Sequence, residues 1–278
     1  MVKVKISDNL IISELIEITH IPHDISTISK ELNKVASTVD TRINKINTEN
    51  LVTTTHSGLE CTWVNDFPIM PDLESSRKIY LFTKRAMDII ISGLALIILS
   101  PILLFTALII KLTDNGSILF VQKRVGYNNK QFDIYKFRTM HHHRCDRSGV
   151  EQTKIDDCRV SQFGKFLRKT SIDELPQLFN ILKGEMSLIG PRPLVKGELA
   201  SGRAYKEIVP YYDLRHSIVP GLTGWSQING FRTRVYQKKW EIEKIEHDIA
   251  YIQNMSLWLD IKILFLTVKN EFFTGSGH

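Results

Sequence analysis

The stretch Ile89-Ile-Ile-Ser-Gly-Leu-Ala-Leu-Ile-Ile-Leu-Ser100-Pro101-Ile-Leu-Leu-Phe-Thr-Ala-Leu-Ile-Ile110 decides the fold class of this chain. It contains 22 residues without a charge, which is long enough to cross a bilayer as a straight helix. Ser100-Pro101 stands at its centre, where proline removes one backbone hydrogen bond and clashes with the preceding turn. We therefore expect an apolar membrane helix that is kinked near its middle.

Basic residues flank both ends of this stretch. Lys84 and Arg85 precede it, and Lys111 follows it at the start of a basic remainder. Because basic flanks stay on the cytoplasmic side, both ends are expected there. A re-entrant helix-break-helix over residues 86–111 satisfies this rule, with Ser100 binding a carbonyl that Pro101 frees. A single kinked span is the alternative that these residues leave open.

The composition indicates a membrane-bound enzyme with more than one part. The chain has 278 residues, 43% of them hydrophobic, and a net charge of +6. Residues 1–75 hold six Lys or Arg against eleven Asp or Glu, a charge of −5, which leaves +11 on the remainder. A basic second part suits anionic lipid headgroups or nucleotide phosphates. Three cysteines without C-x-x-C spacing argue against a disulfide framework.

The most informative chemical motif is a pair of adjacent acids, Asp173-Glu174. Ser171 stands three residues before Glu174, the spacing of a capping box, and apolar residues then recur at helical spacing. The acids are therefore expected at a helix start, with Pro176 in its first turn. A carboxylate there can attack a phosphoryl centre if cations offset the charge. The alternative is that Glu174 only caps the helix.

Cations stand in two places that suit this pair. Arg168 precedes the acids, and Arg192 follows them between two prolines, so both guanidinium groups can clamp phosphate oxygens. Residues 118–140 form two β-leaning runs around a turn at Gly126 to Lys130, which predicts a hairpin. Its alternating polar side chains can offer a cationic face to phosphate or simply face solvent. These side chains are Gln122, Arg124, Lys136 and Arg138.

The N-terminal part has a different pattern. Residues 8–20, 24–32 and 36–49 are expected to be helices, followed by a hairpin of Leu51 to Thr55 and Leu59 to Val64. This order is that of a winged helix-turn-helix. The charge of −5 opposes DNA affinity, so we expect a protein-contact or regulatory module. We divide the chain into this module (1–67), a linker (68–79) and a membrane-associated catalytic domain (80–278, with the re-entrant helix 86–111).

Taken together, these motifs identify a resemblance. From Lys84 to about Lys269 the chain is similar to the bacterial sugar transferase family, the monotopic polyprenyl-phosphate phosphoglycosyl transferases. The matching motifs, in order, are Lys84-Arg85-x-x-Asp88, Ser100-Pro101, Gln122-Lys-Arg-Val-Gly126, Tyr135-Lys-Phe-Arg-Thr139, Arg168 through Gln177, Gly184 through Pro193, Pro220 through Gly230, and Asp248-x-x-Tyr251.

The resemblance implies a reaction and a set of site residues. It implies transfer of a sugar 1-phosphate from a nucleotide sugar, usually a UDP-sugar, to undecaprenyl phosphate with release of UMP. Asp173 is then expected to be the nucleophile and a Mg²⁺ contact, with Glu174 as its partner acid. Substrate-binding residues are expected at the remaining motif positions, which are Arg168, Arg192, Lys84, Arg85, Asp248 and Tyr251.

One position departs from the family pattern. A basic residue often precedes the Pro-Gly of the Pro220 motif, whereas this chain has Val219. Arg215 or His216 can substitute for it. The apolar pattern of residues 240–273 further predicts helices lying in the membrane interface, with Asp248 and Tyr251 on one side of a helix.

The fold class that follows is an α-rich α/β monotopic membrane protein. It combines a re-entrant helix-break-helix, a cytosolic catalytic core with interfacial helices, and a small winged-helix-like α+β domain. We expect it on the cytoplasmic face of the bacterial inner membrane, starting a surface polysaccharide or glycoconjugate. A homodimer and a regulatory partner of the N-terminal module are compatible with this architecture, and DNA is not an expected partner. The alternative function is a membrane-tethered DNA-binding regulator.

Overall fold

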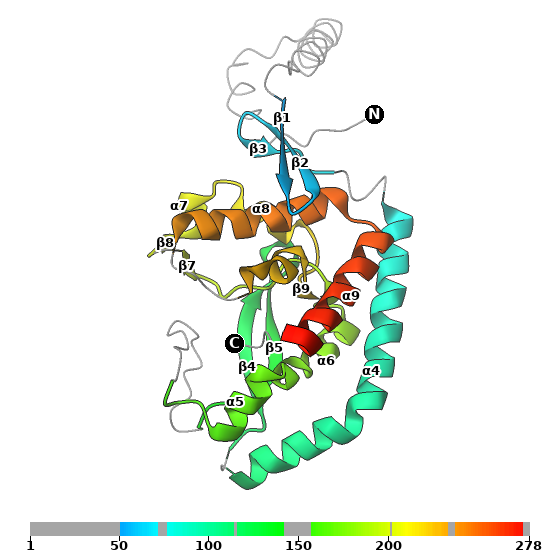
Figure 1. Cartoon of the computed structure of the whole chain (residues 1–278), viewed down its shortest axis with the longest axis vertical. Helices are drawn as coiled ribbons and strands as arrows, with labels where there is room; N and C mark the ends of the chain where they lie inside the picture. The colour runs from blue at the N-terminus through cyan, green and yellow to red at the C-terminus, as the bar shows by residue number, and fades with distance from the viewer. Residues whose placement is uncertain are drawn as a thin grey trace, which may run out of the picture.

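The computed structural model describes residues 51–71, 77–113, 116–141, 157–200, 202–232 and 237–274. Within these residues the fold mixes helices with small sheets, and one long helix runs along the side of the molecule (Figure 1). The three helices predicted within residues 8–49 lie outside the described residues, so the winged-helix interpretation stays a prediction. The α-rich character predicted for the rest is confirmed.

The apolar stretch lies within α4 (Lys78–Thr113), a helix of 36 residues with Pro101 inside it. Such a helix is about 54 Å long, and it is the one described helix long and apolar enough to cross a membrane. The Ser100 hydroxyl donates a hydrogen bond of 2.8 Å to the carbonyl of Ile97. That carbonyl lacks its usual partner because Pro101 has no N–H. The predicted role of Ser100 is therefore confirmed, within one continuous helix.

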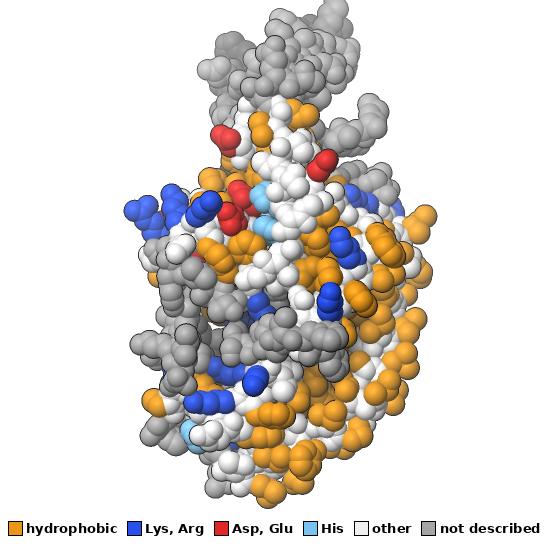
Figure 2. All heavy atoms as spheres, in the orientation of Figure 1, with side chains coloured by type: hydrophobic (Ala, Val, Ile, Leu, Met, Phe, Trp, Pro, Cys, Tyr) orange, Lys and Arg blue, Asp and Glu red, His pale blue; other side chains and the backbone are white. Residues whose placement is uncertain are grey.

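Both ends of α4 pack against the same globular body. Near its start, the Asp88 carboxylate accepts a hydrogen bond from the backbone N–H of Leu188 at 2.9 Å. Near its end, Ile110 is buried with Phe137 and Leu167. Figure 1 shows how the second half of α4 bends toward α5. Between these anchors, the outward side chains are apolar and exposed, and Figure 2 shows them covering this side of the molecule.

The predicted hairpin between residues 118 and 140 is confirmed. Strands β4 (Leu119–Val125) and β5 (Gln131–Phe137) pair antiparallel, with Lys136 opposite Phe120. The short 3-10 helix η2 (Tyr127–Asn129) forms the turn. This hairpin packs against helix α6 (Gln177–Lys183), because the Asn180 amide bonds the β5 backbone at Asp133 and Tyr135. The hairpin therefore lies directly beside the chain segment that carries the paired acids.

The segment around Asp173-Glu174 differs from the predicted capping box. Helix α5 (Gln162–Lys169) is followed by the 3-10 helix η4 (Ile172–Glu174), and α6 begins only at Gln177. Ser171 stands at the N-cap of η4 in the left-handed conformation, with φ of 54°, and its side chain makes no capping hydrogen bond. Its hydroxyl donates to Glu271 at 3.0 Å instead. The capping-box prediction is wrong because the Glu174 side chain is drawn into ion pairs, and Pro176 stands at the N-cap of α6.

A parallel strand pair joins two of the quoted motifs. β6 (Ser187–Ile189) pairs with β9 (Gly221–Thr223). A Cβ on Gly221 would lie 2.1 Å from the backbone nitrogen of Gly190, so only glycine permits this approach. The shorter elements between these strands are β7 (Leu199–Ala200), β8 (Arg203–Ala204), α7 (Tyr205–Ile208) and η5 (Tyr212–Ser217), and the π-helical η6 (Gln227–Phe231) follows β9.

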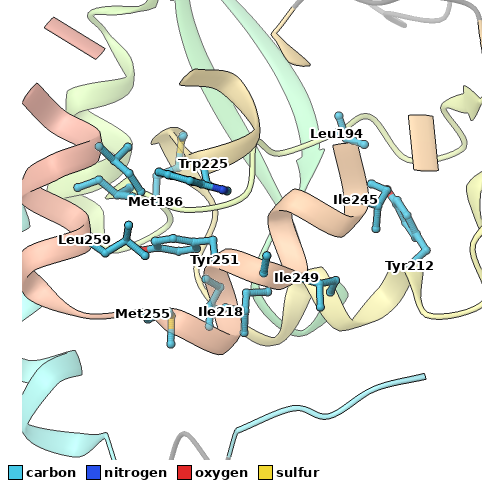
Figure 3. Packing of buried hydrophobic residues seen from close by; sticks show 14 of the residues in the cluster. Met186, Leu194, Tyr212, Ile218, Trp225, Ile245, Ile249, Tyr251, Met255 and Leu259 are labelled. Atoms are coloured by element: carbon cyan, nitrogen blue, oxygen red, sulfur yellow. The ribbon is translucent and has the colours of Figure 1, made fainter. Parts of the chain in front are cut away.

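The two C-terminal helices have different environments. Helix α8 (Lys238–Asn254) is a core helix, because Ile245, Ile249 and Ile252 are buried in the main hydrophobic core. Figure 3 shows Ile245 and Ile249 in this core. Helix α9 (Leu257–Thr274) exposes an apolar side that includes Trp258, Ile261 and Phe265. The prediction of interfacial helices is therefore wrong for α8, since its apolar residues fill the core. For α9 it stays a prediction.

The N-terminal hairpin is confirmed and packs on the core. Strands β1 (Leu51–His56) and β2 (Leu59–Val64) pair antiparallel, and β3 (Phe67–Pro68) extends the sheet. Cys61 and Trp63 belong to the main hydrophobic core. At the hairpin tip, the Ser57 hydroxyl lies 2.9 Å from Nε2 of His247 on α8. This hairpin therefore shares a core with the helices of the C-terminal part.

Candidate active site

The paired acids lie at the centre of a cationic site. Asp173 and Glu174 are 8% and 7% exposed. The Glu174 carboxylate accepts two hydrogen bonds from Arg192, at 2.6 and 3.3 Å, and one from Lys136 at 2.7 Å. A guanidinium nitrogen of Arg232 lies 3.8 Å from the same carboxylate. Three segments far apart in the sequence therefore converge on Glu174.

Asp173 has a different environment from its neighbour. Among the described residues, no side chain or backbone group donates a hydrogen bond to its carboxylate. Burial raises its pKa to about 6, with the charge of Glu174 adding to this effect, while Lys136, Arg168 and Arg192 oppose it. Asp173 is thus a buried carboxylate with free acceptor capacity beside several cations. Such an environment is typical of a reactive acid.

The pKa of Glu174 moves in the opposite direction. Burial alone would raise it, but the charges and hydrogen bonds of Arg192 and Lys136 outweigh burial and hold the pKa well below its ordinary value. Glu174 is therefore ionised throughout the neutral range. Two neighbouring carboxylates whose environments separate their pKa values have different chemical roles.

The structure brings both predicted phosphate-binding arginines to this site. Arg192 binds Glu174 directly, and its backbone carbonyl accepts a hydrogen bond of 2.7 Å from Arg215. Arg168 on α5 donates from Nε to the Thr139 hydroxyl at 2.8 Å and lowers the pKa of Asp173 by its charge. Of the predicted hairpin cations, Lys136 reaches the acids.

The other predicted substrate-binding residues are bonded to protein groups. Lys84 donates to Asp260 at 3.0 Å, and Tyr251 donates to the same carboxylate at 2.6 Å. Arg85 donates to the carbonyls of Ile181 and Leu182 at the end of α6. These contacts join α4, α6, α8 and α9. A substrate contact from any of the three stays a prediction.

Asp248 lies in a buried ion pair. It accepts hydrogen bonds of 2.7 and 3.1 Å from Arg215 and one of 2.7 Å from Ser226. Asp248 and Arg215 are each 1% exposed. Arg215 therefore supports the backbone of Arg192 from within the core. His216 is also buried, and burial together with the charge of Arg215 lowers its pKa to about 4.

Sequence reasoning missed two residues of this site, Arg232 and Glu271. Arg232 follows η6 and forms a short ion pair with Glu271 on α9, and it donates to the Ser171 hydroxyl at 2.8 Å. Neither residue belongs to a motif that the sequence singles out. Arg232 stands two residues after Gly230, the end of a quoted motif, which is the one signal that pointed toward it.

Comparison with known proteins agrees with this geometry. A sequence profile described as bacterial sugar transferase matches residues 79–274. The chain belongs to the bacterial sugar transferase family. The matched range starts with α4, contains every residue of the cationic site and ends with α9.

Individual members of the bacterial sugar transferase family have sequences similar to this chain. An undecaprenyl-phosphate glucose phosphotransferase of Komagataeibacter xylinus is 45% identical over 71% of the chain and 37% of its own length. A UDP-N-acetylgalactosamine-undecaprenyl-phosphate N-acetylgalactosaminephosphotransferase of Aeromonas hydrophila is 44% identical over 72% of the chain and 45% of its own length. The exopolysaccharide production protein PSS of Rhizobium leguminosarum bv. phaseoli is 45% identical over 71% of the chain and 98% of its own length. The chain thus spans less than half of the first two relatives.

Proposed function

We propose that this protein transfers a sugar 1-phosphate from a UDP-sugar to undecaprenyl phosphate through a covalent intermediate on Asp173. One observation carries the proposal. Asp173 is a buried carboxylate that accepts no hydrogen bond from the described residues, and cations surround it. The names of the relatives, which include transferases of glucose and N-acetylgalactosamine phosphates, support the same reaction class.

The reaction proceeds in two displacements at one phosphorus. A carboxylate oxygen of Asp173 attacks the phosphorus that bears the sugar, and the bond from this phosphorus to the bridging oxygen breaks, so that UMP leaves. A phosphate oxygen of undecaprenyl phosphate then attacks the same phosphorus, and the bond to Asp173 breaks. Arg168, Arg192 and Lys136 offset the negative charge in both steps.

Glu174 acts as an organiser of cations and not as a base. Its low pKa makes it a poor proton acceptor at neutral pH. Its carboxylate instead fixes Arg192 and Lys136 at the site. The acceptor phosphate is already ionised at neutral pH and needs no base, so this role is chemically sufficient.

Mg²⁺ fits the donor set at Asp173. No cluster of three or more His, Cys, Asp or Glu side chains occurs among the described residues, but Mg²⁺ in phosphoryl-transfer sites commonly uses one or two carboxylates plus substrate phosphates. Asp173 has free acceptor oxygens for this purpose, whereas those of Glu174 are bound by Arg192 and Lys136. Bound Mg²⁺ would neutralise the diphosphate and improve UMP as a leaving group.

The packing of α4 supports a re-entrant helix on the cytoplasmic face of the inner membrane. Asp88 and Ile110 contact the same globular body from opposite ends of the apolar stretch. A helix that spanned the bilayer would place these ends on opposite sides of a hydrocarbon layer about 30 Å thick. The exposed apolar side of α4 would then lie in the lipid, with the catalytic site facing the cytoplasm.

The decisive experiment is UMP release by the detergent-solubilised protein with undecaprenyl phosphate, Mg²⁺ and a panel of UDP-sugars, beside Asp173→Asn. We expect release with at least one sugar and none from the variant. A labelled sugar phosphate should remain on the wild-type protein when the lipid is omitted. Equal UMP release by Asp173→Asn would overturn the proposed nucleophile, and silence with every donor would overturn the reaction.

A further inference from the structure

A cavity opens beside Glu174, and Arg192 is not among the residues that line it. Its volume is about 480 Å³, within the range of small-molecule sites. It lies between α9, η4 and the segment from Leu222 to Arg232. Most of its wall is apolar, contributed by Leu175, Leu188, Leu222, Ile228, Leu264 and Val268.

The charged part of the cavity wall is concentrated at one place. Ser171, Arg232 and Glu271 are bonded to one another, and Arg232 also lies 3.8 Å from Glu174. Along α9, Leu264 precedes Glu271 by seven residues, which corresponds to about 10 Å of helix. The cavity is therefore amphipathic, with a charged end at the catalytic acid and an apolar wall running along α9.

Arg232 differs from the other cations of the site in its main partner. Arg192 and Lys136 hydrogen-bond Glu174, whereas Arg232 forms its short ion pair with Glu271. The Nε of Arg232 is buried and has no hydrogen-bond partner among the described residues. Glu271 lies near the end of α9, and 23% of its side chain is exposed. Its carboxylate therefore reaches solvent, and an incoming anion that takes its place on Arg232 would offset the loss of the ion pair.

The apolar wall of the cavity reaches the outer surface of α9. Val268 lines the cavity and is also 53% exposed. It lies on the helix that Figure 1 shows running beside α4. Val268 therefore joins the apolar wall of the cavity to the exposed apolar surface of α9, and a long hydrocarbon chain can contact both.

We propose that this cavity holds the first isoprene units of the lipid acceptor, and that its phosphate displaces Glu271 from Arg232. This inference rests on the proposed transferase function. It adds where the lipid acceptor binds, and that its phosphate replaces Glu271 as the partner of Arg232. Both anions can bind a planar guanidinium through two oxygens, but a phosphate monoester has a third terminal oxygen and a higher negative charge than a carboxylate, and so competes well with it. The exchange places the acceptor phosphate beside Glu174 and next to the phosphosugar on Asp173.

The first test fills the cavity. Leu264→Trp adds bulk to the apolar wall, and Phe265→Trp is the matched control because Phe265 faces outward with 68% exposure. With the UDP-sugar that the wild-type protein accepts, we expect Leu264→Trp to raise the KM for undecaprenyl phosphate at least about tenfold, as for a core position that cannot accommodate added volume. UMP release in a single turnover without lipid should be unchanged, which also shows that the variant is folded.

The second test removes the competing charge. Glu271→Gln keeps the shape of the side chain but weakens its hold on Arg232, so the KM for undecaprenyl phosphate should fall several-fold, and Arg232→Lys should raise it. A higher KM in Glu271→Gln would overturn the exchange, because Glu271 would then only position Arg232. An unchanged lipid KM in both Leu264→Trp and Glu271→Gln would overturn the cavity assignment.

The wild-type protein separates failure of this inference from failure of the proposed function. If it forms no lipid-linked product with any UDP-sugar, the proposed function and this inference both fall. If it forms product and retains the labelled sugar phosphate without lipid, the transferase function stands, and only the lipid KM values of the variants decide the inference.

Discussion

The turn at Asp173 and the buried cluster at Asp248 use the same residue types in opposite ways. Asp248 is 1% exposed and accepts three hydrogen bonds, two from Arg215 and one from Ser226. Asp173 is nearly as buried but accepts none from the described residues. A buried acid whose hydrogen bonds are complete stabilises the fold, whereas one left without them is held ready for chemistry at a cost in stability.

The largest expected effect comes from Asp173→Asn, which should abolish transfer and stabilise the fold. Removal of a catalytic nucleophile commonly costs a factor of roughly 10⁴ to 10⁶ in rate. The pKa of Asp173 is about 6 in the folded protein against an ordinary 3.8, so its folded state binds the proton more tightly. Its ionised form therefore destabilises the fold above pH 6, by about 1 to 3 kcal/mol.

Urea unfolding in detergent checks this prediction. The stability gain of Asp173→Asn should be full above pH 6, should shrink as the pH falls to 4, and should disappear near about pH 3, where the wild-type carboxyl is protonated in both the folded and the unfolded protein. Asp133→Asn is the control, since Asp133 forms a half-exposed pair with Lys123 and such pairs contribute little. If Asp173→Asn is less stable than the wild-type protein at pH 8, Asp173 stabilises the fold as Asp248 does, and the contrast between the two acids is wrong.

The next largest effect is expected from Asp248→Asn, which tests the opposite region. It would leave the Arg215 guanidinium buried without a counter-charge, which typically costs about 3 to 5 kcal/mol. We expect a lower free energy of unfolding in urea, with transfer lost only in proportion to the unfolded fraction. Asp213→Asn, which removes an exposed pair with Lys206, should change stability little.

Asp248→Asn also tests whether Asp248 is a structural acid, in contrast to Asp173. If the variant keeps the stability of the wild-type protein but loses transfer, Asp248 is a substrate-binding residue, as its motif in the sequence indicates. The contrast between a structural acid and a catalytic acid would then fail.

A smaller effect is expected from Arg192→Lys. Arg192 donates two hydrogen bonds to Glu174, and lysine keeps the charge but not the planar fork. We expect transfer to fall about 10- to 100-fold, the cost of one or two charge-assisted hydrogen bonds. The unfolding free energy should change little because Lys136 still binds Glu174. Steady-state kinetics check this prediction, with Arg203→Lys as the control because Arg203 is exposed. Equal transfer rates in Arg192→Lys and the wild-type protein would contradict a clamping role for Arg192.

Much of the fold was predictable because its signals are local. The β4–β5 hairpin, the N-terminal β1–β2 hairpin and the Ser100 bond to a freed carbonyl all follow from neighbouring residues. The capping box at Ser171 failed because contacts from distant segments override local propensity. Ser171 is bound by Glu271, one hundred residues later, and Glu174 by Arg192.

The candidate site was predictable where chemistry is tied to a motif. Asp173, Glu174, Arg168 and Arg192 converge as expected. Arg232 and Glu271 meet the acids only through the packing of α9 on η6, which no local pattern encodes. The same limit applies to Lys84 and Asp248, whose predicted substrate contacts stay predictions, because a buried acid or base looks the same in a sequence whether its partner is a substrate or another side chain.

The pH dependence of transfer is the smallest expected effect, and it distinguishes the role of Asp173 from that of Glu174. Below pH 6 the ionised fraction of Asp173 falls about tenfold per unit, so kcat/KM for the UDP-sugar, which reports the free enzyme, should fall with it. Glu174 stays ionised over this range because its pKa is well below the ordinary value. We therefore expect one ascending limb, centred near pH 6, with the unfolding free energy measured at each pH as the control. A limb near pH 4 would mean that the surrounding cations offset the effect of burial on the pKa of Asp173, and the contrast with Asp248 would then be one of hydrogen bonding alone.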